Sequence, residues 1–69
     1  MSKEDYGLSK RELEVLGLIA KGYSDKEIAI KLNITVHTAN SHRKKMLAKL
    51  KARNAAMLVG EAFRKNLLK

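Results

Sequence analysis

Residues 24–35 read SDKEIAIKLNIT, and they predict a short helix that ends in a tight turn. Ser24 is a good N-cap, and Glu27 three residues later completes a capping box. In that arrangement the serine side chain accepts a hydrogen bond from a backbone N–H, and the glutamate accepts one from the backbone of the cap. Asn33 ends the helix, because asparagine tolerates the left-handed backbone conformation better than most residues. With only about two turns, this helix depends on tertiary packing for its stability.

The residues after this turn predict a longer helix that runs from Thr35, its N-cap, to about Lys51. Ala29 in the short helix and Ala39 in the long one are small enough for the two helices to cross closely. A short helix, a tight turn and a longer basic helix describe a helix-turn-helix, whose second helix enters a DNA major groove. The apolar residues of the long helix fall within one face about 100° wide. They are Val36, Ala39, Met46, Leu47 and Leu50.

Two further helices are predicted on either side of this motif. Ser9 and Glu12 form another capping box, and Gly22 ends that helix, since glycine adopts a positive φ without steric cost. Asn54 caps the last helix, in which Gly60 costs about 1 kcal/mol relative to alanine. A close approach between helices would explain Gly60, and so would a tolerated defect. The apolar residues of the last helix are Leu58, Val59, Ala62, Phe63 and Leu67.

The chain has 69 residues, which is enough for one small domain. We expect an all-α fold, a four-helix bundle that contains the helix-turn-helix and spans residues 8–69, after a flexible tail at residues 1–7. The absence of cysteine excludes disulfide scaffolds and zinc fingers built on cysteine. No apolar run approaches the roughly 20 residues of a membrane span, and the first seven residues do not resemble a signal peptide. The expected location is therefore the cytoplasm.

The charge of the chain indicates a polyanionic partner. Fifteen lysines and arginines against seven acidic residues give a net charge of +8, and the pI is about 10.1. No acidic residue occurs between Glu27 and Glu61. An excess of this size in a small domain is typical of nucleic-acid binding. A solvated basic face is the alternative, and an anionic membrane surface is less favoured, because the chain has no tryptophan and one phenylalanine.

Three segments of the chain resemble the LuxR-type helix-turn-helix domains, which are also called GerE- or NarL-type. Residues 8–16, LSKRELEVL, are similar to the family's LTxREXEVL, and residues 19–29, IAKGYSDKEIA, are similar to its IAxGxSNKEIA. The family's LxIS..TV..H......KL is matched by Leu32-Asn33-Ile34-Thr35, Thr38, His42 and Lys49-Leu50. The resemblance covers residues 8 to about 60, almost the whole chain, and the three motifs together are specific.

The resemblance implies a four-helix bundle in which the third helix reads DNA and the fourth forms a dimer interface in some members. Members usually follow a receiver or ligand-sensing domain, and a few stand alone. Three residues depart from the family's pattern. Ala39 replaces a usual valine and loosens the helix crossing, and Ala55 replaces a usual basic residue that pairs with the glutamate of the first helix. Asn40 replaces a usual lysine, which weakens a backbone or guanine contact and favours adenine, since an amide pairs bidentately with N6 and N7 of that base.

The polar face of the third helix supplies the expected DNA contacts. Lys44 lies on it at a position that the family uses to reach bases, with a phosphate contact as the alternative, and Arg43 extends from the apolar side toward solvent or phosphate. Backbone N–H groups and the helix dipole favour a phosphate at the start of the second helix. A structural hydrogen bond is the alternative for His42. We expect base-reading contacts from His37, Asn40, Ser41 and Lys44, and phosphate contacts from Ser24, Lys26, Thr35, Thr38, His42, Lys45, Lys49 and Arg53.

The sequence offers neither a metal site nor a catalytic set. His37 and His42 are five residues apart, whereas metal ligands on one helix need a spacing of three or four. Ser41 beside His42 is no catalytic pair, because neighbouring helical positions point apart. We expect no metal, no cofactor and no enzymatic activity.

The leading function is sequence-specific binding of double-stranded DNA by a bacterial transcription regulator. RNA polymerase is a further candidate partner, and a weak homodimer would form through the fourth helix, with Val59, Phe63 and Leu67 as contacts. We expect no membrane contact, and association with the nucleoid when DNA is bound. Two other functions stay open: a promoter-binding module like region four of a sigma factor, and a basic module that meets an acidic protein. The absence of a Leu-Pro opening and the presence of His42 favour the LuxR type over the sigma factor.

Overall fold

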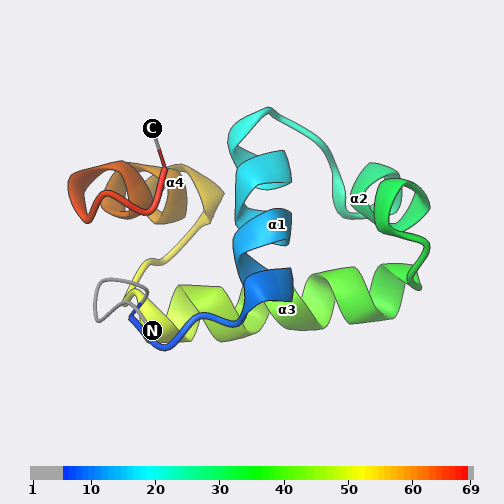
Figure 1. Ribbon diagram of the computed structural model, residues 1–69, viewed down its shortest axis with the longest axis horizontal. Coiled ribbons are helices and arrows are strands. Elements are labelled where there is room, and N and C mark those ends of the chain that lie inside the picture. The colour runs from blue at the N-terminus through cyan, green and yellow to red at the C-terminus, as the bar shows by residue number, and fades with distance from the viewer. Residues whose placement is uncertain (1–5, 69) are drawn as a thin grey trace.

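The computed structural model describes residues 6–68, which form four α-helices and no strand (Figure 1). This confirms the all-α class and the helix order expected from the sequence. Residues 1–5, the larger part of the predicted flexible tail, and residue 69 lie outside the described residues. The helices are α1 (Lys10–Ala20), α2 (Asp25–Leu32), α3 (Val36–Lys49) and α4 (Ala55–Arg64).

The other three helices pack against the longest helix, α3. In Figure 1 it runs along one side of the molecule and α1 stands across its middle. The helix α2 lies over the N-terminal end of α3, and α4 lies on the other side of α1, near the C-terminal end of α3. The core that joins the helices consists of Leu8, Val15, Leu16, Ile19, Ile28, Ala29, Ala39, Met46, Leu50, Leu58 and Ala62.

Each helix begins with the cap that its sequence predicts. Ser9 Oγ accepts a hydrogen bond from Glu12 N at 3.0 Å, and Glu12 Oε1 accepts one from Ser9 N at 2.8 Å. Ser24 and Glu27 repeat this capping box with distances of 3.2 and 2.8 Å. Each of the other two helices has a single capping hydrogen bond. The four N-caps are Ser9, Ser24, Thr35 and Asn54.

Each helix also ends with one recurring backbone arrangement. A residue just after the helix adopts a positive φ, and the backbone N–H of the next residue bonds to the carbonyl five positions earlier, at 2.8 to 3.2 Å. This arrangement satisfies carbonyls that the helix itself leaves unpaired. Gly22, with φ 94°, and Asn33, with φ 56°, confirm the predicted ends of α1 and α2. The four residues with positive φ after the helices are Gly22, Asn33, Lys51 and Asn66.

The helices α3 and α4 are shorter than the sequence predicts. Lys51 adopts φ 54°, so α3 ends before it. Asn66, with φ 61°, turns the chain after α4, and Leu67 therefore lies beyond that helix. Leu67 N donates to Ala62 O at 2.8 Å, and the leucine side chain packs, partly buried, against the core. The prediction that Leu67 belongs to the fourth helix is wrong.

An ion pair between a buried glutamate and an exposed lysine joins α1 to the end of α3. Glu12 is only 3% exposed, and its Oε1 accepts a hydrogen bond from Lys49 Nζ at 2.9 Å. Burial raises the pKa of this carboxyl, but the hydrogen bond from the Ser9 backbone and the Lys49 ammonium outweigh burial and bring the pKa below its usual value of 4.5. Lys49 Nζ also donates to Gly7 O at 2.8 Å, which holds the start of the described chain against α3. Glu12 thus has a basic partner although Ala55 stands where the family usually has one.

Gly60 lies inside α4 with open space beside it. A Cβ atom at this position would meet nothing within 4 Å. No helix among the described residues approaches this glycine closely.

Candidate nucleic-acid interface

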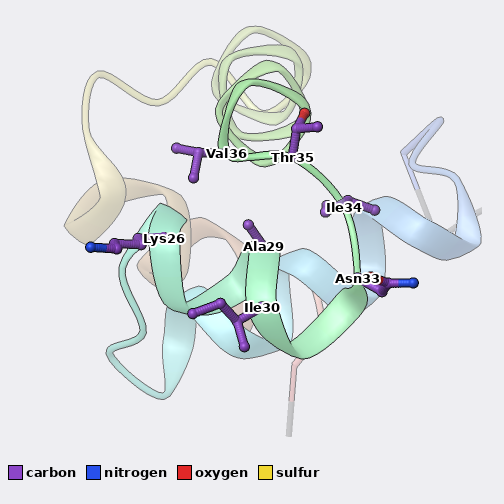
Figure 2. A pocket seen from close by; sticks show the side chains of 7 residues that line it. All are labelled: Lys26, Ala29, Ile30, Asn33, Ile34, Thr35 and Val36. Atoms are coloured by element: carbon purple, nitrogen blue, oxygen red, sulfur yellow. The ribbon is translucent and has the colours of Figure 1, made fainter.

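The predicted helix-turn-helix is formed by α2, the turn at residues 33–35 and α3. Asn33 reverses the chain, and Ile34 N donates to Ala29 O at 3.0 Å. Figure 2 shows Ala29 pointing from α2 toward α3, and Ala39 on α3 is fully buried. These small side chains let the two helices pack closely, as predicted, and leave the polar face of α3 outside.

The polar face of α3 presents basic and hydroxyl side chains. His37, Lys44 and Lys45 are exposed, and Ser41 is partly buried. His37, Ser41 and Lys44 recur at spacings of four and three residues, so they lie on one side of the helix. No acidic residue interrupts residues 28–60. The face therefore combines positive charge with hydrogen-bond donors, which suit phosphates and base edges respectively.

Two other polar residues of α3, Asn40 and Arg43, are held by Asp25 at the start of α2. Asn40 Nδ2 donates to Asp25 Oδ2 at 3.0 Å, and Arg43 Nη2 donates to Asp25 Oδ1 at 2.6 Å. The sequence predicts that the head of Arg43 reaches solvent or a phosphate and gives no sign that its guanidinium pairs with a carboxylate of the same chain, as the structure shows. The sequence patterns assign no role to Asp25, although an acid in the first turn of a helix beside a basic helix is a signal for such a pair.

The residues predicted to contact phosphates differ in the hydrogen bonds that they already make within the chain. Ser24 uses its backbone N–H and its side-chain oxygen in the capping box. Thr35 donates its hydroxyl to Thr38 Oγ1 at 2.8 Å, so the Thr38 hydroxyl keeps its own proton for another acceptor. His42 is partly buried, and its Nδ1 has no hydrogen-bond partner within residues 6–68. The exposed members of the predicted set include Lys26, Lys45 and Arg53.

Lys49 differs from the other predicted phosphate contacts. Two of its three N–H donors are used within the chain, by Glu12 and by the carbonyl of Gly7. A phosphate contact of Lys49 stays a prediction, and the structure adds a role that the sequence did not indicate, which is to neutralise a buried carboxylate.

An open groove of about 530 Å³ lies beside the turn (Figure 2). Two apolar side chains at this groove are exposed, Ile30 by 74% and Val36 by 48%. The prediction that Val36 belongs to the buried face of α3 is wrong, because this first residue of the helix lines the groove instead of the core. The groove is lined by Lys26, Ala29, Ile30, Asn33, Ile34, Thr35 and Val36.

Neither metal-ion clusters nor membrane-spanning helices are found in the described part of the chain. Within residues 6–68 no three His, Cys, Asp or Glu side chains come together as a candidate metal site. Over the same residues, no helix has the length and apolar character needed to cross a bilayer.

A basic helix held behind a tight turn, with its polar face outward, defines a helix-turn-helix DNA-binding domain. The chain belongs to the luxR family of bacterial regulatory proteins, whose profile matches residues 6–62. This match confirms the LuxR-type resemblance and favours it over region four of a sigma factor.

The chain is similar to proteins called oxygen regulatory protein NreC. It is 51% identical over 61 residues to those of Staphylococcus carnosus (strain TM300) and of Staphylococcus aureus (strains JH9 and USA300). Each match covers 88% of this chain and 28% of the relative. The chain therefore spans less than a third of the length of these relatives.

Proposed function

We propose that this domain binds DNA with the polar face of α3 in the major groove, as part of a bacterial transcription regulator. The observation that carries this proposal is the placement of His37, Ser41 and Lys44 on one outward side of a helix without acidic residues. A major groove about 12 Å wide admits one such helix. The relatives are named as regulatory proteins, which supports a regulatory role here. The domain acts by binding and carries out no catalysis.

Two kinds of contact divide the work on DNA, since base contacts specify a sequence and phosphate contacts position the protein. Lys44, on the same side as His37 and Ser41, reads a base, and Lys45 next to it contacts a phosphate. Asn40 completes the base-reading set. The remaining phosphate contacts come from Ser24, Lys26, Thr35, Thr38, His42, Lys49 and Arg53.

A second copy of the chain is the proposed partner of α4. Phe63 is 49% exposed and Met57 is 37% exposed, and Gly60 between them leaves room for another helix. Val59 is partly buried on the same helix. Leu67 contributes less than the sequence predicts, because it lies beyond α4 and packs on the core. Sedimentation at rising concentration tests the dimer, which Phe63→Ser should weaken.

RNA polymerase is a further proposed partner of the whole regulator. Ile30 and Val36, exposed beside the turn, offer apolar surface of the kind that protein contacts use. We place the protein in the cytoplasm, and at the nucleoid when it is bound to DNA.

To test whether the polar face of α3 reads bases, binding sites are first selected from random DNA. The affinity for a selected sequence and for a scrambled sequence is then measured at one salt concentration. Lys44→Ala should lower the preference for the selected site by about 1–3 kcal/mol, whereas Lys45→Ala should weaken both sequences alike. The two variants are matched, because each removes one exposed lysine from neighbouring positions of α3. Equal binding to all DNA and to unrelated polyanions would support a basic protein-interaction module instead.

A further inference from the structure

We propose that Asp25 determines DNA specificity as a positioning residue: its carboxylate orients the amide of Asn40 toward adenine and withholds the guanidinium of Arg43 from DNA phosphates. This role rests on the proposed function, in which α3 reads base edges. It assigns a part in recognition to an acidic side chain on α2, the helix before the one that reads DNA.

The geometry places one carboxylate between two side chains of the reading helix. Asp25 Oδ2 accepts from Asn40 Nδ2 at 3.0 Å, and Asp25 Oδ1 accepts from Arg43 Nη2 at 2.6 Å. The side chains of Asp25 and Arg43 are 20% and 27% exposed. Each carboxylate oxygen therefore has its own partner on α3, in a partly buried setting where hydrogen bonds to a charged group are strong.

The contact with Asn40 selects one orientation of its amide. The oxygen and nitrogen ends of an asparagine side chain are similar in size, so without a partner the amide can present either end. A carboxylate only accepts hydrogen bonds, and it therefore requires the NH2 end. The Asn40 amide then keeps Oδ1 and its second N–H for other partners. Adenine offers an N6 donor and an N7 acceptor in the major groove, which match this remaining pair.

The contact with Asp25 makes Arg43 unavailable for the phosphate contacts that are the same on every DNA sequence. A free arginine on a basic helix would pair with phosphate oxygens, which carry no sequence information. The pairing with Asp25 compensates the charge of Arg43, and its Nε is buried without a hydrogen-bond partner in the described chain. Specificity is a difference between affinities, so suppressing a sequence-independent contact raises it as effectively as adding a base contact.

The experiment compares Asp25→Ala with a control that changes the charge equally. Glu14→Ala also removes one acidic residue and also releases an arginine, since Glu14 pairs with Arg11 on α1 at 3.3 Å. Affinities are measured for the selected site, for its single-base variants and for scrambled DNA, with Asn40→Ala and the double variant Asp25→Ala/Asn40→Ala included. Thermal melting of each variant, followed by circular dichroism, verifies that it is folded.

We expect the unmutated domain to prefer adenine at one position by about 5- to 150-fold, the range for one bidentate pair, and Asn40→Ala to lose that preference. Asp25→Ala should lose most of it as well, and the double variant should lose no more than Asn40→Ala alone. Asp25→Ala should also bind scrambled DNA more tightly than Glu14→Ala does, with a steeper dependence on salt, because Arg43 becomes available to a phosphate.

If the Asp25→Ala variant keeps the adenine preference, the proposed role of Asp25 is wrong, and the proposed function still stands. A double variant that loses further preference would also overturn it, because Asp25 would then act independently of Asn40. If the unmutated domain shows no sequence preference, both this role and the proposed function fail. Asp25→Ser is the second variant, since it keeps a small polar residue in the first turn of α2 without a carboxylate. It must show the same loss of preference.

Discussion

The two capping boxes share a sequence pattern and a local geometry, but they differ in their surroundings. In both, the glutamate accepts a hydrogen bond from the serine N–H at 2.8 Å. Glu12 is buried and paired with Lys49, whereas Glu27 is exposed, and the backbone N–H of Ser24 is the main cause of its lowered pKa. The same motif therefore starts a helix in both places, and in one of them it also ties two helices together.

Replacing Glu12 should have the largest effect of any change to the two boxes. Glu12→Ala removes a cap and leaves Lys49 without its buried partner, so a loss of about 2–4 kcal/mol in the free energy of unfolding is expected. Glu27→Ala is the matched control, and its loss should be clearly smaller because that carboxylate is exposed. Denaturant unfolding followed by circular dichroism measures both. Equal losses would mean that burial of the first box adds nothing to its capping role.

Removing the cation instead of the acid is the next test. Lys49→Met should destabilise the domain by about 1–3 kcal/mol, because Glu12 would remain buried without a counter-charge. Lys45→Met, at an exposed site on the same helix, should change stability by no more than about 0.5 kcal/mol. The same unfolding measurement applies, and a Lys49→Met variant as stable as Lys45→Met would contradict the stabilising role of the ion pair.

Replacing the serine of either capping box should destabilise the domain by a similar amount. Ser9→Ala and Ser24→Ala each remove one capping hydrogen bond, and each should cost about 1 kcal/mol. The similarity is expected because the serine side chains act only on the first turn of their own helix. A large difference between the two variants in thermal unfolding would show that capping itself depends on the tertiary surroundings.

The smallest effect is expected from pH. The folded pKa values of Glu12 and Glu27 lie below the usual 4.5, and hydrogen bonds from Lys65 and Arg64 lower the pKa of Glu61 to about 2. The ionised carboxylates therefore contribute stability that is complete above pH 4.5 and is lost as pH falls through their lowered pKa values, which for Glu61 means toward about 2. Thermal melts against pH should show this fall. Glu12→Gln and Glu27→Gln should each make the loss of stability with falling pH smaller, and an unchanged curve in both would contradict the assignment.

Features that depend on close neighbours in the sequence were predictable. The capping boxes, Gly22 and Asn33 were all found where expected, because the interacting groups lie within a few residues of each other. The pairs Lys49–Glu12 and Arg43–Asp25 join residues 37 and 18 positions apart. Whether such residues meet depends on how the helices pack, and local patterns do not contain that information.

Leu67 and Val36 were misplaced for another reason. Helical periodicity continues through both residues, and it does not report where a helix stops or whether another element covers its first turn. Asn66 was an available signal for the end of α4, since asparagine accepts a positive φ more readily than most residues. The DNA contacts of His37 and Lys44 stay predictions, which the affinity measurements above test.

The short segments that connect the helices bear on the thermodynamics of binding. Residues 21–24, 33–35 and 50–54 link successive helices, and each link carries one of the recurring helix ends. Ordering one backbone residue costs about 1–2 kcal/mol of conformational entropy. Because the backbone is already fixed at both ends of every described helix, binding to DNA should cost little further backbone entropy. The entropic penalty should fall on long side chains such as Lys44 and Lys45, at about 0.5–1.5 kcal/mol each. Association with DNA should therefore resemble the docking of a preformed surface, without coupled folding of the domain.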